Sequence, residues 1–137
     1  MLFRSGGFEG IAVSLSALGE RIFIDGVRVV ADGSVALPVL ARRTAAAGLT
    51  GFEWAVGVPG SVGGAVRMNA GGHGSDMTAS VVDVHLFDLH RGYDAWVPAE
   101  QLGLRFRGSD LADHQIDRKS TRLNSSHERL SRMPSSA

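Results

Sequence analysis

The sequence predicts an α+β fold. Short stretches with strand-like alternation precede a single clear amphipathic helix, and further strand-like stretches follow it. This order differs from the regular alternation of strands and helices that is typical of a doubly wound sheet. The chain has 137 residues, of which 44% are hydrophobic, and that is enough for one core.

The first half of the chain contains three predicted strands and the helix. Residues 11–15, 21–25 and 27–31 alternate in polarity as strands do, and Asp25-Gly26 between the last two favours a tight hairpin. Apolar residues at three- and four-residue spacing predict a helix over residues 35–47. Ser34 is a plausible N-cap, and Gly48 suits a left-handed C-cap.

The second half returns to strands. Residues 81–88 and 94–98 predict a hairpin, with Val82, Val84 and Leu86 on one face of the first strand. Residues 98–102 predict one helical turn.

Composition excludes several classes of protein. The formal net charge is zero, which gives no case for a nucleic-acid or anionic-membrane partner. There is no cysteine, so disulfides and thiolate metal sites are excluded. No apolar run approaches the roughly 20 residues of a membrane helix. The start of the chain also lacks the apolar core of a secretory signal, and we expect a soluble cytoplasmic protein.

A change in composition divides the chain near residue 117. Residues 117–137 carry five Lys/Arg and two acidic residues, seven Ser/Thr and no glycine, whereas all 18 glycines precede them. We expect residues 1–116 to be the folded part. The basic, Ser-rich tail of residues 117–137 is expected to be disordered or to be translated non-native sequence.

The most informative stretch is residues 57–74, hereafter the glycine segment. Seven of its eighteen residues are glycine, although glycine loses more backbone entropy on folding than other residues. A short helix starting near Ser61 would present backbone N–H groups to an anion, and Asn69 offers a donor and an acceptor. The alternative is a loop that packs against its own domain. Neither the P-loop pattern nor the dinucleotide G-x-G-x-x-G pattern is present.

Two other groups of polar side chains are candidates for a functional site. Alternation would place Arg105 and Arg107 on one side of an extended stretch, either as a carboxylate-binding pair or as exposed strand charges. His73 lies among glycines and is more simply a loop residue than a proton carrier. No histidine has metal-ligand spacing, so no metal site is expected.

The glycine segment carries a family resemblance. The run GFEWAVGVPGSVGGA at residues 51–65, followed by NAGGHG at 69–74, closely resembles the hallmark of the UDP-N-acetylenolpyruvoylglucosamine reductases, also called UDP-N-acetylmuramate dehydrogenases. Gly72 replaces the usual alanine. The run VPAEQLGLRFR at residues 97–107 is also similar, and the resemblance covers roughly residues 2–111.

The resemblance implies a bacterial flavoenzyme of peptidoglycan precursor synthesis. It implies part of an FAD-binding domain of the vanillyl-alcohol oxidase (PCMH) type, with NADPH as reductant and a UDP-sugar as substrate. The family's carboxylate-binding arginine falls on Arg107, with Phe106 in place of the usual tyrosine, and this makes Arg107 the catalytic candidate. The residues implied to bind the cofactor are Pro59, Gly60, Ser61, Val62, Gly63, Gly64, Asn69, Gly71 and Gly74.

The departures from the family pattern predict an internal fragment. The family has an upstream glycine-rich segment that helps to bind the FAD pyrophosphate, and its serine proton donor and glutamate lie in a downstream domain. No residue of this chain corresponds to them, and Ser109 does not fill the donor's place. We therefore expect little or no reductase activity from the chain alone. A fragment with weak or no flavin binding and a related FAD-dependent sugar or alcohol oxidase are the alternatives.

Overall fold

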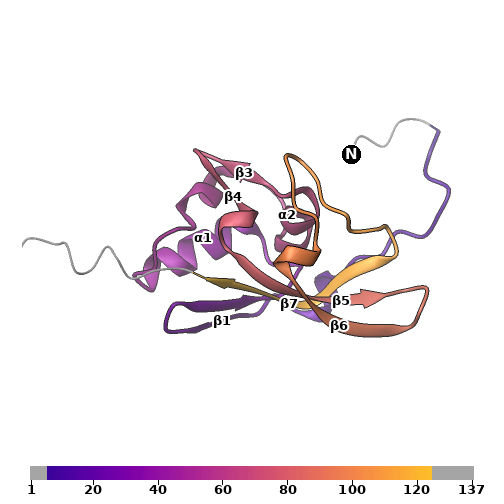
Figure 1. Cartoon of the computed structure of the whole chain (residues 1–137), viewed down its shortest axis with the longest axis horizontal. Helices are drawn as coiled ribbons and strands as arrows, with labels where there is room; N and C mark the ends of the chain where they lie inside the picture. Colours follow the sequence, from indigo (N-terminus) through magenta and orange to yellow (C-terminus); the bar gives the residue numbers. More distant parts are fainter. Residues whose placement is uncertain (1–5, 125–137) are drawn as a thin grey trace, which may run out of the picture.

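The computed structural model describes residues 6–124, and a five-stranded antiparallel sheet forms the base of the molecule (Figure 1). The strands lie in the order β1-β2-β7-β5-β6, and each neighbouring pair is antiparallel. The strands are β1 Ile22–Asp25, β2 Arg28–Ala31, β5 Val81–Asp88, β6 Tyr93–Pro98 and β7 Gln115–Asn124. Together with the helices described next, this sheet confirms the predicted α+β class.

Two helices and a small hairpin cover one face of the sheet (Figure 1). The helices are α1 Leu37–Ala46 and α2 Val62–Met68, and the hairpin pairs β3 Gly71–Gly72 with β4 Ser75–Asp76. The 3₁₀ turns are η1 Ser16–Leu18, η2 Glu53–Gly57, η3 Met77–Ala79 and η4 Ala99–Gln101. None of the helices within residues 6–124 has the length and apolarity to cross a lipid bilayer.

The core lies between this layer and the sheet. Its largest fully buried side chains come from the helices, from three strands and from the connections that hold them together. They are Val29, Val35, Leu37, Leu40, Val62, Val66, Met77, Val84, Leu102 and Leu123.

The predicted β1–β2 hairpin is confirmed. Asp25 pairs with Arg28, and Gly26 in the turn has a φ of +59°, which costs a glycine little. In β5 the predicted shared face is wrong for one residue. Val84 and Leu86 are buried, but Val82 is exposed, because the register against β7 shifts between Val81 and Asp83.

Helix α1 ends as the sequence predicts but begins differently. Gly48 has a φ of +76°, and the amide of Leu49 donates to the carbonyl of Thr44 at 3.0 Å, which closes a Schellman-type end. The predicted N-cap, Ser34, is wrong. The cap position belongs to Ala36, and the Ser34 hydroxyl donates instead to the carbonyl of Gly19.

The predicted strand over residues 11–15 does not form. These residues have no ladder partner among residues 6–124, and Ile11 is 88% exposed. An alternating pattern gives a strand only where a sheet edge is available to pair with it.

The predicted boundary at residue 117 is also wrong. Strand β7 crosses this boundary and lies at the centre of the sheet, between β2 and β5 (Figure 1). Leu123 is buried in the core, and Arg122 makes a two-pronged ion pair with Asp83. A central strand is held by backbone hydrogen bonds on both edges, which a composition argument does not capture. The rest of the predicted tail, residues 125–137, lies outside the described residues.

Candidate functional site

The glycine segment folds into two parts that border two different pockets. Its first part forms the start of α2, which confirms the predicted helix near Ser61 and gives that residue the N-cap position. Its second part forms the end of α2 and the β3–β4 hairpin. We call the pockets beside the two parts the smaller and the larger pocket.

The smaller pocket has a volume of about 310 Å³ and a wall with few side chains. Gly63 and Gly64 in α2, the N-cap Ser61 and the distant Gly33 contribute to this wall. The remaining lining residues are Leu15, Arg67, Leu111, Asp113, Gln115 and Ile116. Within this set Arg67 is paired with Asp113, whose carboxylate is 2.5 Å from the guanidinium.

The amides at the start of α2 are not free, which corrects the prediction that they face an anion. The amides of Val62 and Gly63 donate to backbone carbonyls of the distant loop that precedes α1, each at 2.8 Å. The amide of Gly64 donates to the Ser61 hydroxyl at 3.3 Å. The two carbonyl acceptors are those of Val35 and Gly33. The glycine wall of this pocket therefore offers close approach to the backbone rather than a row of unused donors.

Gly64 is the position where this wall best fits an external group. It is exposed in the middle of α2, where glycine is less favourable than alanine by roughly 0.5–1 kcal/mol. A Cβ added there would meet only the Ser61 hydroxyl oxygen, at 3.4 Å. The packing of the described residues therefore does not require glycine at this position. A large group bound against α2 would require it, because a side chain would stand in its way.

The larger pocket has a volume of about 630 Å³ and lies between the β3–β4 hairpin and the loop that carries Arg107. It is lined by Met68, Asn69, Ala70, Gly71, Gly72, Gly74, Ser75, Asp76, Ala79, Phe106 and Arg107. The structure thus brings four of the predicted site residues together, namely Asn69, Gly71, Gly74 and Arg107.

The glycines of this hairpin have reasons inside the fold. A Cβ on Gly71 would lie 2.7 Å from the carbonyl oxygen of Ser75. His73 and Gly74 have φ angles of +50° and +81°, as the two central positions of a type I′ turn require. His73 is exposed at the tip of this turn and lines neither pocket.

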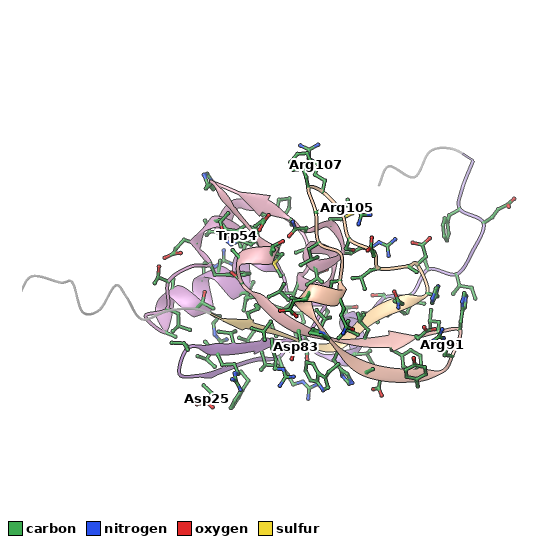
Figure 2. All side chains as sticks on the ribbon, viewed as in Figure 1. Asp25, Trp54, Asp83, Arg91, Arg105 and Arg107 are labelled. Carbon is green, nitrogen blue, oxygen red and sulfur yellow. The ribbon has the colours of Figure 1, made fainter. Side chains whose placement is uncertain are left out.

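Arg107 lies on a tight turn rather than on a strand. The amides of Arg105 and Gly108 each donate to the other residue's carbonyl, at 3.0 and 3.1 Å, and Arg107 has a φ of +55°. Its side chain is exposed and points away from the body of the molecule, with the guanidinium 5.2 Å from the ring of Phe106 (Figure 2). The prediction that the two arginines share one side of an extended stretch is therefore wrong.

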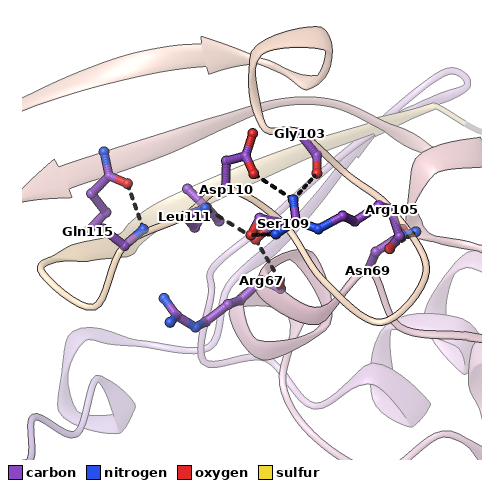
Figure 3. A network of polar contacts seen from close by, with 9 residues as sticks. Arg67, Asn69, Gly103, Arg105, Ser109, Asp110, Leu111 and Gln115 are labelled. Carbon is purple, nitrogen blue, oxygen red and sulfur yellow. Dashed lines mark hydrogen bonds and ion pairs between the residues drawn. The ribbon is translucent and has the colours of Figure 1, made fainter.

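The two arginines also differ in their partners. Arg105 donates to the carboxylate of Asp110 at 2.5 Å and to two backbone carbonyls (Figure 3). Arg107 makes no ion pair with any residue in the range 6–124. Its positive charge is available for a ligand of the larger pocket.

Asn69 contacts the protein rather than leaving its amide for a ligand. It is buried at the left-handed C-cap of α2, and its Nδ2 donates to Asp76 and to the carbonyl of Arg105, at 3.2 and 3.1 Å. Its Oδ1 accepts from the amide and the hydroxyl of Thr78, at 3.0 and 2.9 Å. Both donors and both acceptor positions are used. The prediction that this side chain offers a donor and an acceptor to the cofactor is therefore not supported.

The other predicted residues have structural tasks. Val62 is fully buried, and the carbonyl of Gly60 accepts from the amide of Leu37 at 2.9 Å. Neither these residues nor Pro59 line the smaller or the larger pocket. Sequence reasoning missed Gly33 and Gln115, which reach the smaller pocket from distant positions and carry no local motif. Among the described residues, no group of three His, Asp or Glu side chains could hold a metal ion.

Comparison with known proteins gives consistent matches. A family model described as an FAD binding domain matches residues 1–92. The UDP-N-acetylenolpyruvoylglucosamine reductase of Rubrobacter xylanophilus is 40% identical over 114 residues, which are 83% of this chain and 38% of that protein. That of Bacillus subtilis is 39% identical over 105 residues, which are 77% of this chain and 34% of that protein.

A solved structure agrees with these matches. The crystal structure of UDP-N-acetylenolpyruvylglucosamine reductase from Thermus caldophilus superposes with a TM-score of 0.61 at 33% identity. The match covers 75% of this chain and 39% of that one. The chain therefore spans little more than a third of the length of the proteins it matches.

Proposed function

The chain belongs to the FAD-binding domain family, and from this premise we propose that it is the FAD-binding part of a UDP-N-acetylenolpyruvoylglucosamine reductase. The wider activity in this proposal is the NADPH-dependent reduction of the enolpyruvyl group of a UDP-sugar to a UDP-N-acetylmuramate, in the cytoplasm. The observation that carries the FAD part is the open surface at Gly64, where a side chain has room but glycine stands.

The residues that would hold the cofactor come from both pockets. Ser61, Gly63 and Gly64 would present bare backbone, and Gly71 and Gly74 would continue this surface along the hairpin. When bound, FAD supplies hydride chemistry, accepting hydride from NADPH and delivering it to the enolpyruvyl double bond.

Arg107 is proposed as the catalytic residue. Hydride addition to an enol ether places negative charge on the carbon beside the carboxylate. A guanidinium held against that carboxylate stabilises the charge as it develops. Arg107 suits this role because it lies at the rim of the larger pocket and has no acidic partner within the described part of the chain.

Flavin titration of the purified chain tests the proposal. We expect the fluorescence of added FAD to change on binding, and we expect Gly64→Leu to weaken binding by about tenfold or more, because overpacking typically costs roughly 1–3 kcal/mol. Ala46→Leu, at an exposed position of α1, is the matched control and should bind as the wild type does.

Two results would count against the proposal. Equal affinities for wild type and Gly64→Leu would remove the smaller pocket from the cofactor site. Absence of binding by the wild type at any accessible FAD concentration would favour the alternative of a fragment that does not bind flavin.

A further inference from the structure

No hydrogen bond or ion pair within residues 6–124 fixes the guanidinium of Arg107. Its side chain packs against the ring of the neighbouring Phe106, which lies on the same turn. A guanidinium on a free loop samples many positions, and a charge stabilises a reacting group only where it is held in place. The groups that hold the turn of residues 105–108 are therefore part of the working site, although they touch no substrate.

The turn is attached to α2 at two points (Figure 3). The hydroxyl of Ser109 donates to the carbonyl of Arg67 at 2.6 Å, and Nδ2 of Asn69 donates to the carbonyl of Arg105 at 3.1 Å. Arg67 and Asn69 lie at the C-terminal end of α2, and the residues they hold, Ser109 and Arg105, stand on either side of Arg107 in sequence. The two bonds thus fix the flanks of the turn to one rigid element.

A second set of contacts stiffens the turn itself. Arg105 spans it internally, donating to the carbonyls of Gly103 and Ser109 and to the carboxylate of Asp110. The amide of Asp110 donates to the carbonyl of Leu102 at 2.8 Å. These bonds close the loop but do not connect it to α2. The base of the loop is held by Leu102, Leu104 and Leu111 on the core, and Arg67 pairs with the exposed Asp113 beyond the turn. The hydrogen bonds that join the turn itself to α2 are those of Ser109 and Asn69.

We propose that Ser109 and Asn69 are positioning residues that hold the Arg107 turn over the larger pocket. This inference rests on the proposed role of Arg107, and it assigns new roles to both side chains. The hydroxyl proton of Ser109 is engaged with a backbone carbonyl, and Asn69 joins the glycine hairpin to the turn through Asp76 and Arg105.

The first test measures opening of the turn by trypsin in the full chain. Trypsin cuts after Arg107 only when the turn opens to an extended strand, so the rate of this cut reports the open population. We expect Ser109→Ala to accelerate it about fivefold, as the loss of one hydrogen bond implies. Ser34→Ala is the matched control, since it also removes a half-buried hydroxyl that donates to a distant backbone carbonyl.

Asn69 is tested by two variants, because its left-handed backbone complicates an alanine. Asn69→Gly keeps the conformation accessible and deletes the side chain. Asn69→Asp keeps the acceptor for Thr78, loses the donor to Arg105 and to Asp76, and places a second carboxylate beside Asp76. Both should accelerate the cut after Arg107. Failure of all three variants to exceed the Ser34→Ala rate would overturn the proposal.

A second readout follows the guanidinium directly. Phosphoenolpyruvate carries an enolpyruvyl carboxylate, and its binding is measured from the NMR shift of the Arg107 Nε–H group. We expect Ser109→Ala to weaken this binding severalfold, Ser109→Thr to restore it and Ser34→Ala to leave it unchanged. Equal binding by the Ser109→Ala and wild-type chains would overturn the positioning role. No flavin is added in either assay, so the proposal can stand or fall independently of FAD binding.

Discussion

The two parts of the glycine segment look alike in sequence but owe their glycines to different causes. In the hairpin, the fold itself requires Gly71 and Gly74, since a Cβ on Gly71 would meet the Ser75 carbonyl and Gly74 has a positive φ. In α2, the described fold does not require Gly64, whose φ is not positive and whose surroundings admit a methyl group. Glycine density is therefore evidence for a ligand only after the glycines that the backbone needs have been set aside.

The largest effect is expected from Gly71→Ala, at a hairpin glycine that the fold requires. We expect destabilisation by about 1–3 kcal/mol, because the new Cβ would overlap backbone atoms that have no flexible end to move. Denaturant unfolding measures the loss. Gly72→Ala is the control, since the nearest atom to its Cβ would be a methyl of Val58 at 3.4 Å. Equal stabilities of the two variants would show that the hairpin glycines are not under this constraint.

Gly64→Ala tests the glycine of α2 that the described fold does not require. We expect it to raise the free energy of unfolding by roughly 0.5–1 kcal/mol, because alanine is the better helix residue. Affinity for FAD should fall in the same variant, since the methyl group faces the smaller pocket. Gly57→Ala, at an exposed position away from both pockets, should not change FAD affinity. A variant that gains stability and keeps full FAD affinity would contradict the reason given for this glycine.

The β5–β6 turn supplies a third case, in which a side chain secures the turn. Burial alone would raise the pKa of Asp88, but the amides of Arg91 and His90 donate to its carboxylate, and His114 and Arg91 add positive charge. The net result is a pKa below the ordinary value of 3.8.

This carboxylate should give the smallest effect, and one that depends on pH. A lowered pKa means that the contribution is present above pH 3.8 and is lost as the pH falls through the folded-state value. We expect wild type to exceed Asp88→Asn in melting temperature by a small margin near neutral pH, with the margin closing in acid. If the difference in melting temperature between wild type and Asp88→Asn did not change with pH, it could not come from the ionised carboxylate of Asp88.

The elements defined by local chemistry could be predicted from the sequence. The β1–β2 hairpin, the end of α1 at Gly48 and the N-cap Ser61 each follow from a few adjacent residues. The errors concern partners that are distant in sequence. Residues 11–15 are predicted as a strand but have no neighbouring strand in the described structure. Residues 115–124 are not predicted as a strand but form β7, which pairs with both β2 and β5.

The candidate site divides in the same way. The glycine segment and Arg107 could be selected from motifs alone. Val35 and Gly33 accept the hydrogen bonds of two α2 amides, and Thr78 donates to the Asn69 side chain. These partners are distant in sequence, and only the fold brings them together. Sequence therefore identifies which residues surround the pockets better than which of their atoms remain available.

The left-handed backbone of Arg107 means that stability and chemistry make opposite demands at one residue. Glycine would relax this turn, yet it would remove the only positively charged side chain among the residues that line the larger pocket. Directed evolution of this protein for thermal stability alone would favour replacing Arg107 by glycine. Persistence of the arginine in a library selected for carboxylate binding would then show that binding, and not stability, keeps it.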